Sequence, residues 1–288
     1  MKKWFEYHVM PGAGTERFVP LNDSFEAQSK AMGGYEATEH YADQDSFEAK
    51  YYHGRYVIWK RYIESRIKER ENILSIASGR AIVEMMLKKD GFGITCSDLE
   101  VPACYQRTTE LFGPFDYLKM DITGKPPEAK YRAAICLSAI FLLDREQLHR
   151  MFRNVAALLQ SGGMFILDSA GSNPTPLCSW YHNVFLRLEA RLYRLRLHLS
   201  PRSKKKYDLI RKHKGYRWAT KELIEFAREH GLILLDQAVF DPVTDLRRSR
   251  YLRRITDSPN SLPCRLLVRL LGRRMHHIRM FTFIKNQA

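Results

Sequence analysis

The chain has 288 residues, of which 45% are hydrophobic, and its formal net charge is +15. This length and apolar content can bury the core of one elaborated domain. Residues 1–10 include two lysines but no apolar stretch, so we expect no signal peptide. The apolar stretch Ala133–Leu143 is too short to cross a bilayer and suits a buried strand with its exit loop. We therefore expect a cytoplasmic protein.

The five cysteines form no CxxC pair, and two of them lie in predicted strands. This pattern is typical of a protein from the reduced cytosol, and it predicts neither a disulfide framework nor a metal site. The cysteines are Cys96, Cys104, Cys136, Cys178 and Cys264.

The positive charge is concentrated in the second half of the chain. Residues 1–171 hold 22 Lys and Arg against 23 Asp and Glu, a net charge of −1, whereas residues 172–288 hold 25 against 9, a net charge of +16. This asymmetry indicates an anionic partner for the second half, such as nucleic acid, a phosphate-bearing substrate or an acidic membrane surface.

The first elements are an arm and a helix. Residues 1–54 are polar, aromatic and interrupted by glycine, which is typical of an arm or lid. Residues 55–70 are predicted to form a helix, because their apolar side chains recur at helical spacing. These apolar residues are Tyr56, Trp59, Tyr62, Ile63 and Ile67.

Residues 73–100 have the pattern of one nucleotide-binding βαβ unit. A strand over 73–77 stops at the small turn Ser78-Gly79, a helix follows over 81–89, and a second strand covers 92–96. Asp98 follows Gly79 by 19 residues, about where such units place a carboxylate on the ribose hydroxyls of a nucleoside. The unit therefore predicts an adenosine-type cofactor.

The glycines that are missing indicate which cofactor. A dinucleotide fold requires GxGxxG, because its backbone amides hold a pyrophosphate at a helix N-terminus. Here Ala77 and Ala81 occupy the first and third glycine positions, and only Gly79 remains. A ligand with ribose and adenine but no phosphate tolerates that loss better, and S-adenosylmethionine is such a ligand.

Five motifs in order carry a resemblance to a known family: ILSIASGRA, CSDLE, KMDIT, AAICLSAIFLLD and SGGMFILD. With them the chain resembles the class I S-adenosylmethionine-dependent methyltransferases over residues 55–171, with weaker support over 216–240 and 279–285. The resemblance implies an α/β fold with a Rossmann-like doubly wound sheet of seven strands, the last one antiparallel. The composition of residues 1–54 and the positions of the two basic segments add an N-terminal lid and two basic helical insertions to this core.

The resemblance also implies the cofactor-binding residues. Asp98 matches the ribose carboxylate, with Glu100 as the alternative, Asp121 matches the adenine contact, and the backbone at Gly79 approaches the methionine moiety. Ser75 stands where the family usually has an acidic residue at the end of the first strand. The full set of expected cofactor-binding residues is Ala77, Ser78, Gly79, Asp98, Glu100, Asp121 and Ser138.

The remaining elements complete the alternation of helices and strands. We expect helices over 102–112, 144–160 and 220–230, and strands over 115–120, 164–167, 233–240 and 279–284. Asp144 and Gln147 predict a capping box at the start of the second of these helices. The core thus comprises residues 55–171 and returns in 218–288.

Two basic segments interrupt the core. Residues 172–217 predict an amphipathic basic helix, although the alternation RLRLHL also permits a strand, and residues 241–278 hold nine arginines and no lysine. Three interpretations stay open: a packed cap with solvated arginines, a surface for an anionic membrane, and a docking site for nucleic acid, which ranks below a small or lipid-linked substrate.

Catalysis by positioning suits a sulfonium methyl donor, and a hydroxyl acceptor also benefits from a general base. The candidates are His53, Asp144, Asp168 and His182, although packing, helix capping or a turn explains each of them as well. Tyr51, Tyr52 and Tyr56 can line the methyl pocket or pack in the core.

The sequence therefore predicts a methyltransferase, directed to oxygen or nitrogen, for a small-molecule or glycan acceptor that includes lipid-linked and phosphorylated ones. It would lie in the cytoplasm or at the membrane periphery. The alternatives are an RNA-modifying methyltransferase and a non-catalytic S-adenosylmethionine-binding protein.

Overall fold

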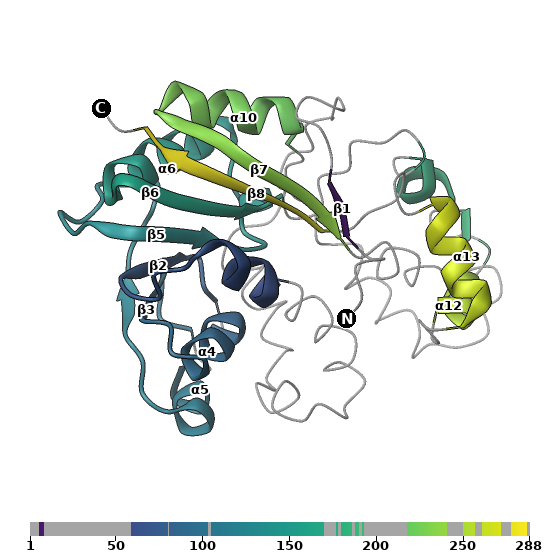
Figure 1. The fold of residues 1–288 in the computed structure, drawn as a ribbon, viewed down its shortest axis with the longest axis horizontal. Coiled ribbons are helices and arrows are strands. Elements are labelled where there is room, and N and C mark those ends of the chain that lie inside the picture. Colours follow the sequence, from purple (N-terminus) through teal and green to yellow (C-terminus); the bar gives the residue numbers. More distant parts are fainter. Residues whose placement is uncertain are drawn as a thin grey trace. The chain divides into compact units, whose positions relative to one another are not determined.

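The protein was analysed as a computed structural model (Figure 1). It describes residues 6–8, 59–79, 81–102, 105–169, 177, 180–185, 188–189, 192, 218–240, 250–256, 261–271 and 278–286. The chain divides into two compact units. The first comprises Met1–Gly34, Gly171–Lys221 and Ala238–Arg279, and the second comprises Tyr35–Ala170, Glu222–Gln237 and Met280–Ala288.

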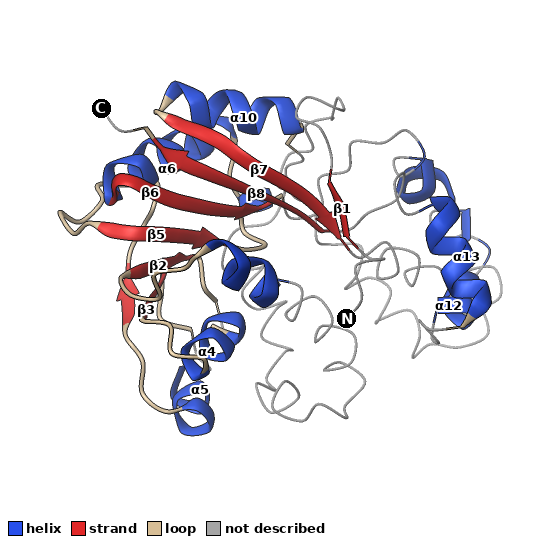
Figure 2. Cartoon of the chain, in the orientation of Figure 1, coloured by secondary structure: helices blue, strands red, loops and turns tan. Residues whose placement is uncertain are grey.

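The seven strands predicted from the sequence are all present in one sheet, with the order β1-β7-β8-β6-β5-β2-β3-β4. In chain order they are β2 (Ile73–Ile76), β3 (Ile94–Asp98), β4 (Tyr117–Lys119), β5 (Tyr131–Cys136), β6 (Leu159–Asp168), β7 (Leu232–Phe240) and β8 (Ile278–Lys285). Strand β8 runs antiparallel to β6, while β2, β3, β4, β5 and β6 pair in parallel (Figure 2). The α/β class and the antiparallel last strand are therefore confirmed.

An eighth strand was not expected. Residues Glu6–His8 form β1, which pairs antiparallel with β7 from Glu6↔Phe240 to His8↔Ala238. The rest of the predicted arm, including Tyr51, Tyr52 and His53, lies outside the described residues, as does Tyr56 at the start of the predicted helix 55–70. A three-residue strand has too few alternating positions to be recognised from sequence.

Helices cover both faces of the sheet in the second unit. Successive side chains of a strand point to opposite faces, so neighbouring residues of β8 identify the layers. Phe283 contacts Phe152 of α6 (Arg145–Leu158), and Phe152 in turn contacts Phe226 of α10 (Thr220–Glu229). Thr282 instead contacts Tyr62 on the helix at 59–66. The sheet is therefore covered on both faces, as a doubly wound fold requires.

A capping box marks the start of α6, and the beginning of β6 marks its end. The predicted capping box is confirmed: Gln147 N donates to Asp144 Oδ1 over 2.8 Å and Asp144 N donates to Gln147 Oε1 over 2.9 Å. The helix ends at Leu158, however, two residues before the predicted end, and β6 begins at Leu159. A bulge in β6 then requires Gly163, because a Cβ there would lie 2.9 Å from Gln160 O.

The other helices of the second unit are α4 (Ile82–Lys89) and α5 (Tyr105–Phe112), both within the predicted segments. The first unit contains a π-helical turn, η3 (Tyr181–Phe185), and the helices α12 (Arg250–Thr256) and α13 (Leu262–Leu271). Within the described residues, no helix has the length and apolarity needed to span a membrane.

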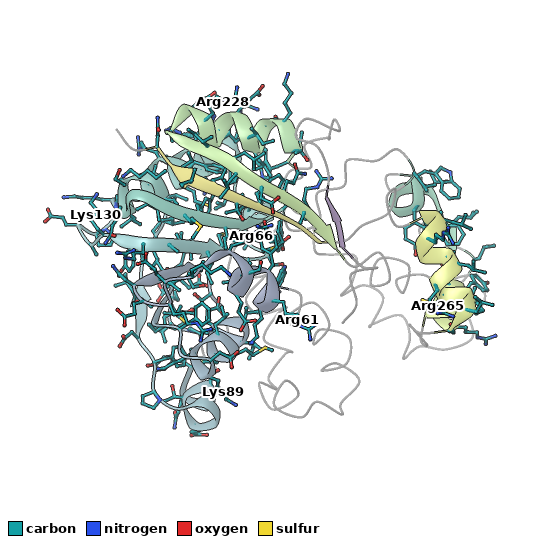
Figure 3. The ribbon with its side chains drawn as sticks, in the orientation of Figure 1. Arg61, Arg66, Lys89, Lys130, Arg228 and Arg265 are labelled. Carbon is teal, nitrogen blue, oxygen red and sulfur yellow. The ribbon has the colours of Figure 1, made fainter. Side chains whose placement is uncertain are left out.

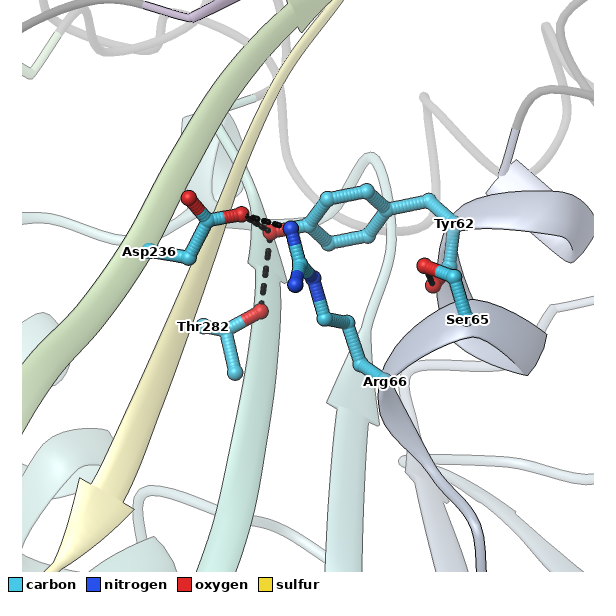
Figure 4. A network of polar contacts seen from close by, with 5 residues as sticks. All are labelled: Tyr62, Ser65, Arg66, Asp236 and Thr282. Atoms are coloured by element: carbon cyan, nitrogen blue, oxygen red, sulfur yellow. Dashed lines mark hydrogen bonds and ion pairs between the residues drawn. The ribbon is translucent and has the colours of Figure 1, made fainter.

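The helix at 59–66 is held against β7 and β8 by a polar network (Figure 4). The Tyr62 hydroxyl donates to Asp236 Oδ2 over 3.2 Å and lies 2.8 Å from Thr282 Oγ1. Arg66 forms an ion pair with the same Asp236 carboxylate. Burial raises the pKa of Tyr62 to about 12, so the hydroxyl keeps its proton at neutral pH. The predicted apolar stripe packs beside this network, since Trp59, Ile63 and Ile67 are buried.

We expect Tyr62→Phe to lower the free energy of unfolding by about 1–3 kcal/mol, because Thr282 would be left buried without its hydroxyl partner. Urea unfolding followed by circular dichroism measures the change. Tyr251→Phe is the matched control, since Tyr251 is exposed. Equal stability of Tyr62→Phe and the parent protein would contradict the role assigned to this network.

Candidate cofactor-binding site

The candidate site lies where the strand order reverses. From β2 the chain proceeds outward to β3 and β4, and it returns on the other side of β2 as β5. At this switch point the last residues of β2 and β5, Ile76 and Cys136, are paired. Open parallel sheets bind ligands at the carboxyl ends of their strands, at such a reversal. The loop 77–81, which follows β2, therefore occupies the expected position for a ligand.

The backbone of this loop has the conformation that glycines normally provide. Ala77, Gly79 and Ala81 have φ values of 53°, 51° and 57°. These values lie in the left-handed region, which costs an L-residue roughly 1–2 kcal/mol and glycine almost nothing. The two alanines have thus kept the glycine-type loop at an energetic cost. No described atom lies within 4 Å of a Cβ built on Gly79, so the backbone there is open to close approach.

Asp98, at the end of β3, holds the loop in place. Gly79 N donates to Asp98 Oδ2 over 3.0 Å, and Leu99 N donates to Asp98 Oδ1 over 2.8 Å. Burial raises the pKa of Asp98, while these two backbone hydrogen bonds lower it. The predicted ribose carboxylate therefore lies directly against the predicted cofactor loop.

Ser78 links the loop to β3 through both its backbone and its side chain. Ser78 N donates to Ser97 O over 2.9 Å, and Ser97 N donates to Ser78 Oγ over 3.1 Å. The Tyr117 hydroxyl on β4 donates to Gly79 O over 3.0 Å. Hydrogen bonds to β3 and β4 therefore hold the loop at Ser78 and Gly79.

Glu100, the alternative ribose ligand, is directed elsewhere. Its side chain is exposed and forms an ion pair of 2.7 Å with Lys119. No described hydrogen bond connects Glu100 with the loop 77–81. Of the two carboxylates, Asp98 alone contacts the loop among the described residues.

A buried carboxylate that the sequence analysis missed lies beneath the loop. Glu84 is 4% exposed in the first turn of α4, and its Oε1 accepts a 2.6 Å hydrogen bond from Ser75 Oγ. Burial raises the pKa of Glu84 to about 7. Ser75 stands at the position where the family usually has an acidic residue, so α4 supplies a carboxylate at the end of β2 that the strand itself lacks. The serine at position 75, where the family usually has an acidic residue, was the sequence signal that could have pointed to Glu84.

Three carboxylates surround the switch point. The pKa of the Cys136 thiol is raised, mainly by burial and further by the charges of Asp168, Asp98 and Glu84. Asp168 is buried as the last residue of β6. Acidic side chains from β3, α4 and β6 therefore act on the carboxyl end of β5.

The remaining predicted cofactor residues lie in loops that follow β4 and β5. Asp121 is exposed, and its Oδ1 accepts hydrogen bonds from the amide and the hydroxyl of Thr123. Asn154 fixes the same loop by donating to Ile122 O and Gly124 O. Ser138, two residues after β5, has a left-handed backbone with φ 54°. Asp121 and Ser138 thus follow the correct strand ends, and each has a local structural role.

The four catalytic candidates have different surroundings. Asp144 is used as the cap of α6, which is the alternative role expected from the sequence. Asp168 is the buried last residue of β6, and its charge helps to raise the pKa of the Cys136 thiol at the end of neighbouring β5. His53 lies outside the described residues, as does the side chain of His182.

Three further residues could hold a metal ion, although the sequence predicts no metal site. His149, Glu229 and His230 place one ligand atom each within 4.8 Å of one another. The ring of His149 packs on Phe226 at a centroid distance of 4.2 Å, and its Nδ1 is 3.4 Å from Glu229 Oε2. Packing and an ion pair account for His149 and Glu229 without a metal.

We expect Ala77→Gly to raise the free energy of unfolding by up to about 1 kcal/mol, because it relieves the left-handed strain at φ 53°. Ala156→Gly, in the interior of α6, is the matched control and should lower stability by about 1 kcal/mol. Thermal and urea unfolding of both variants measure the difference. If Ala77→Gly lost as much stability as the control, the backbone at Ala77 would not be strained.

The Glu84 carboxyl should make stability depend on pH. Its folded pKa of about 7 exceeds the reference value of 4.5, so its stabilising contribution is complete below pH 4.5 and is lost as the pH rises to about 7. This loss is worth about 3 kcal/mol. Glu84→Gln should flatten the dependence of the unfolding midpoint on pH over this interval. Glu71→Gln is the control: Glu71 is exposed, so this variant should keep the pH dependence of the parent protein. If Glu84→Gln also kept the parent's pH dependence, Glu84 would not be its source.

Comparison with known proteins extends this picture. No protein family model matches the sequence. The chain is 26% identical over 121 residues to the Bacillus subtilis protein named "Putative methyltransferase YqeM". The match covers 40% of this chain and 49% of the relative, so the chain spans about half the length of the curated relative that it matches.

Solved structures with a similar fold include several methyltransferases. The magnesium protoporphyrin IX methyltransferase of Synechocystis, with bound S-adenosylhomocysteine, has a TM-score of 0.53 at 13% identity, with 88% of this chain and 94% of that chain covered. The 1,6-didemethyltoxoflavin-N1-methyltransferase of Burkholderia thailandensis has a TM-score of 0.51 at 10% identity, with 98% of this chain and 99% of that chain covered. A TehB-like methyltransferase of Corynebacterium glutamicum has a TM-score of 0.50 at 13% identity, with 91% and 100% covered. The chain therefore has the fold of the class I S-adenosylmethionine-dependent methyltransferases.

Proposed function

We propose that the chain is an S-adenosylmethionine-dependent methyltransferase that acts on a small-molecule or glycan acceptor, including lipid-linked and phosphorylated ones. The observation that carries the proposal is the loop 77–81 at the switch point, whose Gly79 amide is hydrogen-bonded to Asp98 at the end of the next strand. Three of the similar solved structures bind S-adenosylmethionine or S-adenosylhomocysteine in a protein of this fold, which supports the choice of cofactor.

Asp98 is the residue that would hold the ribose. Each carboxylate oxygen can accept two hydrogen bonds, and the backbone amides of Gly79 and Leu99 use one position on each oxygen. One further position on each oxygen remains for the two ribose hydroxyls. The same geometry fixes the distance between the ribose and the Gly79 backbone, along which the methionine moiety would lie.

The charges at the site favour the methyl donor over its product. The charges of Asp168 and Asp98 help to raise the pKa of the Cys136 thiol, which lies at the end of β5. S-adenosylmethionine carries a sulfonium cation, and S-adenosylhomocysteine does not. The carboxylates should therefore bind the donor more tightly than the product, which would promote product release after transfer.

The bound donor would supply an electrophilic methyl group, so the protein has little further chemistry to perform. Its residues must orient the acceptor in line with the carbon–sulfur bond and exclude water. In this proposal, the exclusion of water is assigned to the arm 1–54 and the role of proton acceptor to Asp168 or His53. Asp168 is favoured by its position at the end of β6, beside β5.

Two observations support a small acceptor. The exit of β5 reads Ser138-Ala139-Ile140-Phe141 and not the Asn/Asp-Pro-Pro-aromatic tetrapeptide of enzymes that methylate amino groups in nucleic acids. The similar structures from Synechocystis and Burkholderia thailandensis are named for a porphyrin and a toxoflavin precursor, which are small molecules. RNA is the competing acceptor class, because of the basic second half of the chain.

We expect Asp98→Ala to weaken S-adenosylhomocysteine binding by about 1.5–3 kcal/mol for each hydrogen bond to the carboxylate that is lost. Isothermal titration calorimetry measures the affinity. Glu100→Gln is the matched control and should bind like the parent protein, because Glu100 is paired with Lys119. Unchanged affinity in Asp98→Ala together with a loss in Glu100→Gln would transfer the ribose contact to Glu100.

Transfer of a labelled methyl group tests the reaction and its acceptor class. The parent protein should label a small-molecule, glycan or lipid fraction of a cell extract, and Asp98→Ala should label it more weakly at low donor concentration. Label found in RNA alone would contradict the acceptor class. Cofactor binding without transfer to any fraction would instead indicate a non-catalytic binding protein.

A further inference from the structure

The helical elements of the first unit pack around one small core. Tyr181 is buried at its centre, and half-buried apolar residues from three segments surround it. These residues are Leu177, Phe185, Leu252, Leu267 and Leu271. The ring of Tyr181 stacks on Phe185 at a centroid distance of 5.4 Å. The inner faces of η3, α12 and α13 are therefore occupied by one another.

Helix α13 carries a second apolar stripe on its opposite face. Ser261 Oγ accepts a hydrogen bond from Cys264 N at the start of the helix, which fixes its register. Cys264 is then buried, while Leu262, Leu266 and Leu270 are 61%, 49% and 74% exposed. A spacing of four residues places these three leucines in one line along the helix. A soluble helix would normally present polar residues on this line.

The neighbouring segments repeat this pattern. Around η3, large apolar residues recur every fourth position and are about half exposed: Trp180, Val184, Leu188 and Leu192. On α12, Tyr251 and Ile255 are also four residues apart and exposed. Large exposed apolar residues are scarcer in the described part of the second unit. We call these six residues, together with Leu262, Leu266 and Leu270 of α13, the outer apolar face.

Arginines accompany the outer apolar face. Arg254, Arg265 and Arg269 are exposed, and Figure 3 shows Arg265 extending from α13. Residues 241–278 contain nine arginines, three aspartates and no lysine. Leucine stripes flanked by arginine, with tryptophan and tyrosine among them, match the layered chemistry of a bilayer surface, where acyl chains lie beneath anionic phosphates.

We propose that the outer apolar face docks on the surface of an anionic lipid bilayer. The apolar stripes would enter the boundary between headgroups and acyl chains, and the arginines would contact lipid phosphates in a bidentate manner. A nucleic acid fits less well, because its phosphate backbone has no apolar surface against which the three exposed leucines of α13 could be buried. The proposal does not depend on methyl transfer, since every residue in it belongs to the first unit.

Sedimentation with vesicles tests the proposal on the full chain. The parent protein should bind vesicles of phosphatidylcholine that contain about a third phosphatidylglycerol, and binding should weaken at high salt. Pure phosphatidylcholine should bind at least about tenfold less. Equal binding to both vesicle types, or no binding to either, would overturn the proposal.

Two variants separate the apolar and the charged contributions to vesicle binding. Leu266→Ser with Leu270→Ser should weaken vesicle binding by about tenfold to a hundredfold, because two exposed leucines no longer enter the bilayer. Arg265→Gln with Arg269→Gln should weaken binding and reduce its dependence on salt. The control is Ile233→Ser with Leu235→Ser on β7, whose side chains are similarly exposed but belong to the second unit, and it should bind like the parent.

Circular dichroism establishes that each variant is folded, and S-adenosylhomocysteine binding should be unchanged, because the candidate cofactor site lies in the second unit. Normal vesicle binding by the folded Leu266→Ser with Leu270→Ser variant would overturn the proposal. So would a stable dimer that is lost in that variant, since a second copy would then cover the face, and so would salt-dependent retention of RNA without vesicle binding.

Discussion

The hydrogen bond from the Gly79 amide to Asp98 is the constraint on which the candidate site depends. It joins the loop after β2 to the end of β3, and it places the only glycine left in the loop against the carboxylate expected to hold a ribose. Ser78 and Tyr117 strengthen the same link through β3 and β4. The loop can keep its left-handed residues because these contacts specify its shape from several sides. A ligand therefore finds a site that is already formed.

The loop shows how a chain can lose the usual residues of a site and keep its geometry. Ala77 and Ala81 adopt the left-handed conformation that glycine prefers, at a cost of about 1–2 kcal/mol each. Serine has replaced an acidic residue at the end of β2, and Glu84 on α4 brings a buried carboxylate to the same place. The charges of Asp98 and Asp168 reach the neighbouring end of β5, where they help to raise the pKa of Cys136. These replacements explain why sequence motifs alone describe the site incompletely.

Local sequence patterns were sufficient for most of the core. Alternating apolar stretches and helical stripes predicted all seven main strands, and the capping residues Asp144 and Gln147 marked the start of α6 correctly. The strand Glu6–His8 was missed, because its stability comes from pairing with β7, about 230 residues away. The helix before β6 was extended too far, since the bulge at Gly163 depends on contact with β5. Glu84 was missed for the same reason: only the fold brings it to Ser75.

A structure of the chain with bound S-adenosylhomocysteine would test the central claim most directly. We expect both ribose hydroxyls to lie within hydrogen-bond distance of the Asp98 carboxylate. The adenine should lie near Asp121, and the amino-acid moiety should follow the backbone of the loop 77–81. A ligand whose ribose lies on Glu100, or which binds away from the carboxyl ends of β2 and β3, would contradict it.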